Sequence, residues 1–157
     1  MTDAEVKAGL TELHVTGLTI AGEAEGEPIE GKVFVGSVIR NRVKTPGRFG
    51  DSYDKVCLAR SQFSCWWPWG GQANFEKVMA RARMFVGDYA ERPNLMTDVL
   101  RECLFVAEGI ITNQLRDNSR SATHYMTKAL FKSNPPDWAK GKTPIVEVGA
   151  HVGFRLT

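Results

Sequence analysis

Apolar residues recur at helical spacing over most of residues 1–111, and an alternating pattern typical of strands is found only near the C-terminus. The pattern predicts helices from the capping residue Asp3 to about residue 26, from Glu30 or Gly31 to about Val43, over residues 53–60, from the capping residue Asn74 to Phe85, and from the capping residue Thr97 to Ile111. Residues 44–72 are expected to be mostly irregular, and residues 91–94 to form a loop.

Three short segments after Asn118 favour strands: Ala122–Met126, Ile145–Val148 and residues 149–156. No internal repeat, low-complexity tract or interdomain linker interrupts the chain, so we expect a single domain over residues 1–157. Helices followed by a small sheet predict an α+β fold, mainly helical with a small antiparallel β element near the C-terminus.

The composition fits one soluble domain and excludes two other classes of protein. The chain has 157 residues, 43% of them hydrophobic, which is too many for a disordered chain. The formal net charge of +2 argues against a protein that binds nucleic acid through charge alone. Residues 119–157 hold six basic and two acidic residues, so this end either faces a polyanion or is ordinary solvated surface.

The sequence carries no signal for export, membrane insertion, metal or cofactor. Residues 1–7 lack the basic and apolar regions of a signal peptide, and no apolar run reaches the roughly 20 residues that span a bilayer. We therefore expect synthesis in the cytoplasm and no membrane insertion. Cys57, Cys65 and Cys103 form no C-x-x-C pair, so buried thiols and no metal site are expected; a Cys57–Cys65 disulfide would need an oxidising compartment. Because no P-loop or G-x-G-x-x-G motif is present, we expect no cofactor.

The most unusual stretch is Gly22–Pro28, in which Glu23, Glu25 and Glu27 alternate with small residues where an apolar helix meets a loop. Like charges this close repel, and desolvation beside apolar residues raises the pKa of a carboxyl group. A carboxyl group with a raised pKa can donate a proton near neutral pH. The alternative interpretation is a solvated acidic loop.

A second unusual stretch, Gln62–Trp69, holds three tryptophans in a loop rich in Gly and Pro. Exposed indole rings can stack on sugar rings, and the neighbouring Gln62 and Ser64 can form hydrogen bonds with hydroxyl or N-acetyl groups. The alternative is a small hydrophobic cluster under a long loop.

Two histidines, His124 and His151, fall on predicted strands. Either could form a Cys/His nucleophile with Cys65 or ligate a metal, although no diagnostic spacing such as H-E-x-x-H is present. A structural histidine is the simpler interpretation of each. Asn41 and Arg42 close the second predicted helix, where they can aim polar groups at the same site, or Arg42 can cap the helix.

Several of these segments, taken in order, carry a resemblance to a known family. They are Gly22–Pro28, Glu30–Val33, Val38–Val43, Gln62–Trp66, Ala122–Tyr125, Pro135–Ala139 and Gly149–Phe154. In this order they resemble the spore cortex-lytic family of cell wall hydrolases, over about residues 18–156. Each motif is weak alone, and the specific signal is their order.

The resemblance implies a lysozyme-like fold and a single catalytic domain that cleaves peptidoglycan between N-acetylmuramic acid and N-acetylglucosamine. It implies a muramidase or a lytic transglycosylase, the latter leaving a 1,6-anhydro end. The family's catalytic glutamate falls on Glu23, and Glu27 is the second candidate acid. The side chains expected to bind the glycan are Gln62, Ser64, Trp66, Trp67 and His124.

Two departures from the family pattern concern the site. Glu25 stands where the family has Arg, which is expected to push the pKa of Glu23 further up. Gly153 is inserted in the family's Gly-x-His-x-Phe-Tyr ending and Arg155 replaces its Tyr, which weakens any transfer of roles to the last strand.

Without an export signal, the chain resembles a phage endolysin: a monomer, released through a holin pore, that acts on the cell wall. Two other functions stay open. One is a Cys/His or metal-dependent wall amidase or peptidase, motivated by Cys65, His124 and His151. The other is a non-catalytic glycan-binding module built on the tryptophan loop.

Overall fold

The computed structural model describes residues 1–88 and 95–156. Its helices are α1 (Asp3–Gly9), α2 (Glu12–Ala24), α3 (Ile29–Val43), α4 (Tyr53–Leu58), α5 (Gln72–Val86), α6 (Asp98–Ile111) and α7 (Lys128–Ser133), with the short 3-10 turns η1 (Ser64–Trp66), η2 (Pro68–Gly70) and η3 (Asp137–Ala139). Its strands are β1 (His124–Thr127), β2 (Val146–Val148) and β3 (His151–Phe154). The expected α+β class is confirmed, and the loop predicted at residues 91–94 lies outside the described residues. Within those residues, no helix combines the length and the hydropathy that a bilayer span requires.

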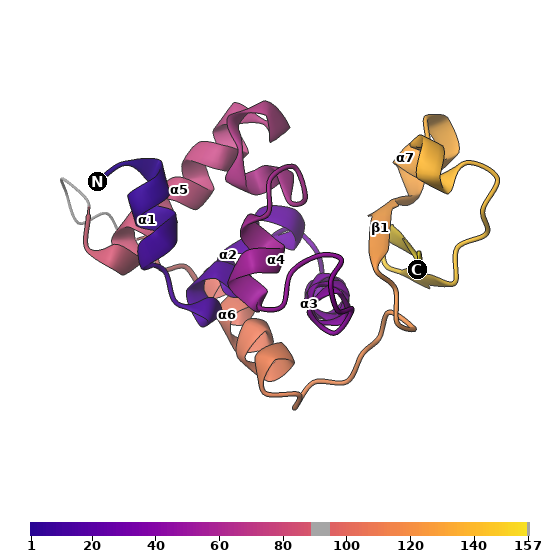
Figure 1. Cartoon of the computed structure of the whole chain (residues 1–157), viewed down its shortest axis with the longest axis horizontal. Coiled ribbons are helices and arrows are strands. Elements are labelled where there is room, and N and C mark those ends of the chain that lie inside the picture. Colours follow the sequence, from indigo (N-terminus) through magenta and orange to yellow (C-terminus); the bar gives the residue numbers. More distant parts are fainter. Residues whose placement is uncertain (89–94, 157) are drawn as a thin grey trace.

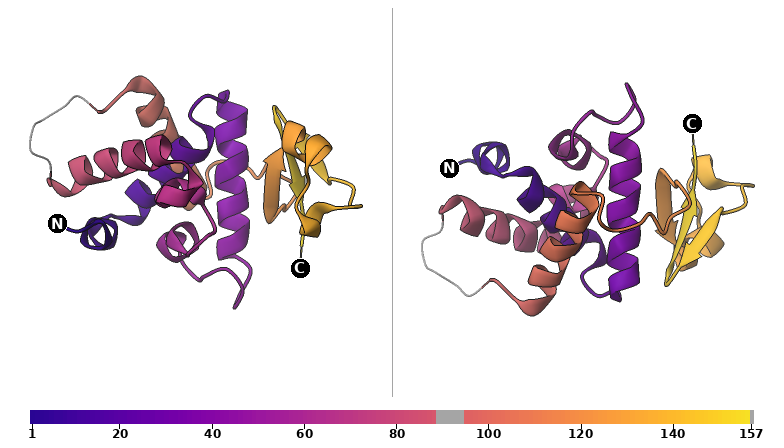
Figure 2. Two further views of the ribbon diagram at one scale, coloured as in Figure 1. Left: turned by 90° about the horizontal axis from the view of Figure 1, so that it is seen from above. Right: turned by 90° about the horizontal axis from the view of Figure 1, so that it is seen from below.

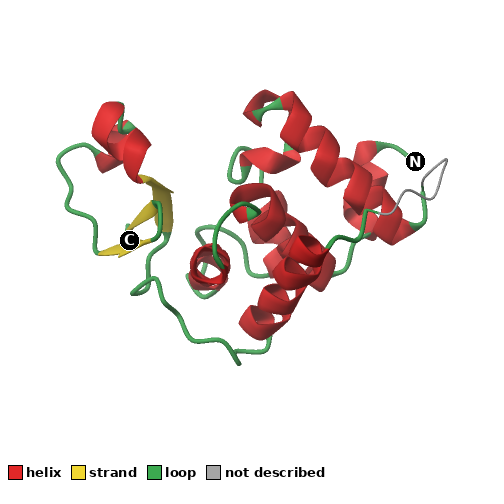
Figure 3. Ribbon diagram, turned by 180° about the vertical axis from the view of Figure 1, so that it is seen from behind, coloured by secondary structure: helices red, strands yellow, loops and turns green. Residues whose placement is uncertain are grey.

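Helix α3 separates two parts of the molecule. On one side lies a body formed by α1, α2, α4, α5 and α6, and on the other lie the sheet and α7 (Figures 1 and 2). The view from behind shows the same division, with α3 end-on between the red helices and the yellow strands (Figure 3). The chain crosses from the helical body to the sheet after α6, so residues from both halves of the sequence face each other beside α3.

Helix α2 is the centre of the helical body and is buried from Val15 to Ala21. It packs most extensively against α6. Gly17 allows this close packing, because a Cβ atom there would lie only 2.5 Å from Cδ2 of Leu104. The residue with poor helix propensity in the middle of α2 therefore serves tertiary packing.

The first predicted helix is two helices, and the prediction of one continuous helix is wrong. Thr2, not Asp3, caps α1 with a reciprocal bond to Glu5, and Leu10 is extended. Thr11 then caps α2. A threonine hydroxyl that bonds the backbone of the next turn starts a new helix wherever the preceding residue leaves helical geometry.

Later elements differ less from the prediction. Thr97 caps α6 as expected. Gly71 precedes α5, and the side chain of Asn74 donates instead to the carbonyl of Gly22 at 3.0 Å. Helix α7, capped by Thr127, was not predicted.

The sheet is antiparallel with the order β1-β3-β2, and all four residues of the central β3 are buried. Gly153 pairs with Tyr125 and Val146 in an unbroken register, so it is an ordinary strand residue. A Cβ atom at Gly153 would lie 2.7 Å from Val146 Cγ1 and 3.1 Å from Phe34 Cζ. Glycine here lets the sheet pack closely on α3.

Candidate active site

A cleft of about 640 Å³ opens between the loop of residues 61–69 and the surface formed by β1, α7 and η3. It is lined by Glu23, Arg42, Ser61, Gln62, Phe63, Ser64, Trp69, His124, Tyr125, Met126, Thr127, Leu130, Trp138 and His151. The structure thus brings together Glu23 and the expected glycan-binding residues Gln62, Ser64 and His124, and it adds the candidates Arg42 and His151 to the same cleft.

Glu23 lies in the last turn of α2 and is half-buried. Burial raises its pKa above the ordinary value of 4.5, while hydrogen bonds with Tyr125 and Cys65 and the charge of Arg42 oppose the rise. The net shift is upward, so the carboxyl group keeps its proton to a higher pH than it would in water. Such a group, facing a cleft, can give a proton to a bound molecule and later take one back.

Two contacts fix the backbone that carries Glu23. Gly22 lies so close to η1 that a Cβ atom there would be 2.6 Å from Cβ of Cys65. On its other side, Asn74 of α5 donates its hydrogen bond to the Gly22 carbonyl. The glycine before the glutamate therefore lets the end of α2 press against the loop that forms one wall of the cleft.

Arg42 is the buried cation of the cleft. Its Nε donates to the carbonyl of Thr123 at 2.7 Å and its Nη1 to Oε1 of Gln62 at 3.1 Å. The guanidinium lies 5.0 Å from the ring centre of Phe49 and 5.1 Å from that of Phe63. Burial lowers its pKa from the ordinary value of 12.5, but an arginine remains charged at neutral pH.

Tyr125 faces Glu23 from β1. Burial, followed by the nearby Glu23 carboxylate, raises its pKa well above 10.0, so its hydroxyl group stays protonated and able to donate. Its ring meets those of Phe34 and His151 edge-on, with ring centres 5.8 Å and 5.5 Å apart. Packing against α3 and β3 therefore holds the hydroxyl group in place.

His124 is a neutral residue of the cleft wall. Burial, followed by the charge of Arg42, lowers its pKa to about 4. Its ring lies 4.9 Å from that of Trp138, and its Nδ1 is 3.0 Å from Oγ1 of Thr123. A neutral imidazole offers one donor and one acceptor, which suits hydrogen bonding to sugar groups.

The tryptophan loop divides into core and surface. Trp66 is fully buried and donates from Nε1 to Oγ1 of Thr19 at 2.9 Å, so the expectation that it binds the glycan is wrong: its indole belongs to the core. Trp67 is half-buried beneath the ammonium group of Lys7, 3.9 Å away, and is not among the cleft residues. It stacks at 5.0 Å on Trp69, which is 60% exposed and does line the cleft.

The other two glutamates of the acidic stretch point elsewhere. Glu25 forms ion pairs of 2.7 Å with Arg81 and Lys77, so its charge is compensated and the expected upward push on the pKa of Glu23 is not found. Glu27 is outside the cleft and lies 3.6 Å from Nδ1 of His151.

The three thiols are free and buried, as expected from the sequence. Burial, followed by the charge of Glu23, raises the pKa of Cys65 well above 9.0, and Cys65 does not line the cleft with His124 or His151. A Cys/His nucleophile needs a thiolate in contact with its substrate, so this pair has no support. Among the described residues, no three His, Cys, Asp or Glu side chains converge as metal ligands.

Trp69 lines the cleft, as expected for the tryptophan loop, but sequence reasoning gave no role to Tyr125 and Trp138, two further aromatic residues of the cleft. Tyr125 follows His124 in the segment Ala122–Tyr125, so alternation along β1 could have placed its side chain on the side that packs against Phe34 of α3. Of the polar residues at the end of α3, Arg42 enters the cleft, whereas Asn41 bonds Ser119 and the backbone of Ala122.

Comparisons with known proteins agree with this architecture. A family model described as cell wall hydrolase matches residues 26–154, starting just after Glu23. The fold is similar to the catalytic domain of the SleB protein of Bacillus cereus, with 20% identity over 90% of this chain and 88% of that chain, and a TM-score of 0.58. It is also similar to the catalytic domain of the germination-specific lytic transglycosylase SleB of Bacillus anthracis, with 19% identity over 92% and 96% of the two chains and a TM-score of 0.59. Among curated proteins, none matches this chain.

Proposed function

Because the chain belongs to the cell wall hydrolase family, we propose that its cleft cleaves the glycan strand of peptidoglycan between N-acetylmuramic acid and N-acetylglucosamine, as a lytic transglycosylase with Glu23 as the acid and base. The observation that carries this proposal is the set of groups facing the cleft. Among its described lining residues, Glu23 is the one carboxylic acid, and it is a half-buried one with a raised pKa.

A single carboxyl group favours transglycosylation over hydrolysis. Inverting and retaining glycosidases normally use two carboxylates on opposite sides of the scissile bond. In this cleft the polar groups near Glu23 are a cation, a phenol, two imidazoles, one amide and three aliphatic hydroxyls. The similarity of the fold to a germination-specific lytic transglycosylase of Bacillus anthracis is consistent with the same chemistry.

The proposed reaction has two proton transfers through one residue. Protonated Glu23 gives its proton to the glycosidic oxygen while the C1–O bond of the muramic acid breaks, and the freed sugar leaves with a new hydroxyl group. The ionised Glu23 then takes the proton from the 6-hydroxyl of the same muramic acid as O6 bonds to C1. The product is a 1,6-anhydro end, no water is consumed, and Glu23 regains its proton.

Tyr125 and Cys65 can stabilise Glu23 while it is ionised. The Tyr125 side chain and the Cys65 backbone form hydrogen bonds that favour the charged form of Glu23, and Arg42 favours it through its charge. These groups oppose the effect of burial without overcoming it, so Glu23 remains able to pass between both protonation states.

Mass spectrometry of digested sacculi tests the proposal. The expected products carry 1,6-anhydromuramic acid. New reducing ends would instead show hydrolysis, and intact glycan with cut peptides would overturn glycan cleavage. Glu23→Gln should keep the fold and lose activity; retained activity would transfer the role to another residue.

The role of an endolysin in host lysis, with cytoplasmic synthesis, holin-assisted release and a monomeric state, stays a prediction from sequence. We propose to test it by expressing the chain in bacteria with and without a holin. Lysis that needs the holin is the expected result, and light scattering on the purified protein measures its oligomeric state. Lysis without a holin would contradict holin-assisted release.

A further inference from the structure

Glu27 and His151 form a buried contact between the helical body and the sheet that the proposed reaction does not use. Nδ1 of His151 lies 3.6 Å from Oε1 of Glu27, and the His151 side chain is only 6% exposed. This Nδ1 is buried and has no hydrogen-bond partner in the structure. Glu27 is held in turn by Lys32, whose Nζ donates to the Glu27 carbonyl at 2.7 Å.

His151 also reaches the cleft. It is one of the lining residues, its ring stacks on Phe34 with centres 5.9 Å apart, and it meets Tyr125 edge-on. Nδ1 is buried and faces Glu27. Nε2 is not among the buried atoms without a hydrogen-bond partner, so the Nε2 edge of the ring is the one that can face the cleft.

We propose that Glu27 fixes His151 in the tautomer that carries its proton on Nδ1, so that Nε2 presents a hydrogen-bond acceptor to the glycan beside Glu23. The substrate group that it would accept from is an O–H or acetamido N–H of a sugar in the cleft. This inference rests on the proposed function, and it replaces the expectation of Glu27 as a second acid with the role of a positioning residue.

The electrostatic surroundings keep the ring neutral, as this role requires. Burial lowers the pKa of His151 below 6.5, and Glu27 opposes this shift without reversing it. Of the other titratable groups, Tyr125 on β1 packs against the ring and Glu23 lines the same cleft, whereas Glu147 pairs with Val152 and so lies on the opposite face of the sheet. A neutral imidazole beside a carboxylate places its proton on the nitrogen that faces that carboxylate.

The first test is spectroscopic and needs no turnover. Nitrogen-15 correlation spectra of the side chain at neutral pH should show His151 protonated at Nδ1 in the wild type. Glu27→Gln should shift the ring toward the other tautomer. A wild-type ring protonated at Nε2, or a tautomer unchanged by Glu27→Gln, would overturn the proposal whatever the enzyme does.

The second test uses the rate of glycan cleavage. Glu27→Gln and His151→Phe should each lower the rate about 10- to 100-fold, the range that misplacement of one polar contact can cost. His151→Gln, whose amide can reach the place of Nε2, should recover much of the rate and should no longer respond to Glu27→Gln. Equal losses in His151→Gln and His151→Phe would overturn the acceptor role.

Glu30→Gln is the matched control. Glu30 is an exposed carboxylate in the first turn of α3, close to Glu27 in the chain, and it does not line the cleft. Its substitution should change neither the tautomer nor the rate. If the wild type makes no glycan products, the proposed function fails; if it makes them and Glu27→Gln is fully active, only this inference fails.

Discussion

Arg42 donates a hydrogen bond from Nη1 to Oε1 of Gln62 at 3.1 Å, which ties the buried floor of the cleft to its exposed wall. The same guanidinium is anchored through Nε to the Thr123 carbonyl, next to β1. Because Oε1 of Gln62 is occupied by Arg42, its amide nitrogen is the group left to donate to a ligand. One arginine thus orients the polar groups of the cleft from both sides.

Arg42→Lys is expected to weaken glycan binding while the fold is kept. Lysine retains the charge but not the planar fork that reaches two acceptors at once, and the lost contacts are worth about 1–3 kcal/mol. The measurement is binding of solubilised glycan strands to variants made in the inactive Glu23→Gln background. Gln62→Ala should show a similar loss, and adding Arg42→Lys to it should add little, because the two residues act as one unit. Fully additive losses would contradict the coupling.

How far the site could be predicted depends on whether a role is encoded locally. Glu23 could be found because its helix-end motif is continuous in sequence, and Gln62 and Ser64 because they flank the tryptophans. Trp66 and Trp69 could not be told apart, since the loop that contains them has no period from which to read burial. Packing against residues far earlier in the chain makes Trp66 a core residue, and its indole there finds a hydrogen-bond partner in Thr19.

The fold shows the same division between local and non-local information. Thr97 marks the start of α6 because a cap acts within one turn. The partners of Glu25 and Glu27 lie on α5 and β3, so sequence spacing could not tell that one glutamate is neutralised and the other faces a histidine. Long-range pairs of this kind decide the electrostatics of the site.

Trp66→Ala should destabilise the fold, whereas Trp69→Ala should weaken binding. Truncating a fully buried indole removes core packing and its bond to Thr19, at a cost of about 3–5 kcal/mol. Trp69 is 60% exposed, so its removal should change the free energy of unfolding by no more than about 0.5 kcal/mol. Denaturant unfolding and glycan binding measured on both variants separate the two effects. A destabilised Trp69→Ala with unchanged binding would contradict the assignment of Trp69 to the cleft.

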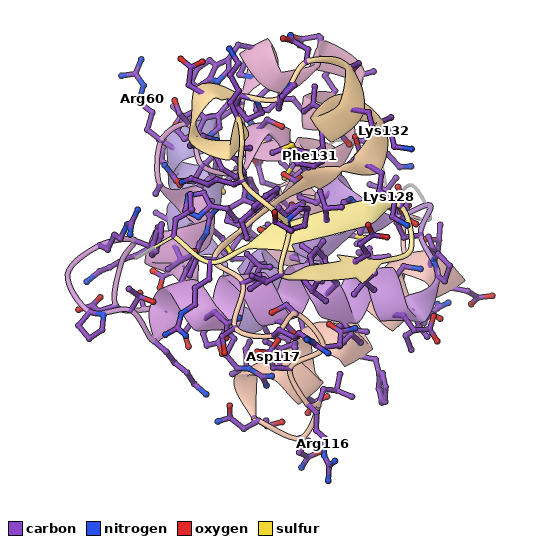
Figure 4. All side chains as sticks on the ribbon, turned by 90° about the vertical axis from the view of Figure 1, so that its right-hand side faces the viewer. Arg60, Arg116, Asp117, Lys128, Phe131 and Lys132 are labelled. Carbon is purple, nitrogen blue, oxygen red and sulfur yellow. The ribbon has the colours of Figure 1, made fainter. Side chains whose placement is uncertain are left out.

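Charge reversal on the sheet side should weaken attachment to the wall at low salt. Figure 4 shows Lys128 and Lys132 projecting from this side of the molecule. Lys128 is paired with Glu147 at 3.2 Å and Lys140 with Asp137 at 3.0 Å, in exposed pairs that contribute little. Peptidoglycan carries carboxylates on its peptides, so Lys132→Glu should lower sacculus binding.

Salt provides the control for this effect. Attraction between exposed charges is screened beyond about 8 Å at physiological ionic strength, so the variant and the wild type should converge as salt is added. The control variant is Arg116→Glu, which lies away from Lys132 in Figure 4 and should leave sacculus binding unchanged. Equal binding by Lys132→Glu and the wild type at low salt would show that this end is ordinary solvated surface.

Glu23→Gln should be more stable than the wild type at neutral pH. The pKa of Glu23 is raised above 4.5 in the folded state, mainly by burial, so the folded chain binds more protons than the unfolded chain between these two pKa values. Stability therefore falls as pH rises from about 4.5 through the folded pKa, and the loss is complete above it. Glutamine does not ionise and escapes this loss. Activity of the wild type should fall over the same upper range, because the proton donor is lost.

Glu25→Gln serves as the control, because the pKa of Glu25, on the same turn, is lowered and not raised. Burial alone would raise the pKa of Glu25, but hydrogen bonds to Arg81 and Lys77 overcome it and lower the pKa, so this carboxylate stabilises the fold when ionised. Its stabilising effect is lost as pH falls through the lowered pKa, and Glu25→Gln should be less stable than the wild type at neutral pH. Denaturant titrations of the three proteins from about pH 4 to about pH 8 measure both effects. A Glu23→Gln variant that is no more stable than the wild type at neutral pH would show that burial of the ionised Glu23 carboxylate does not destabilise the fold.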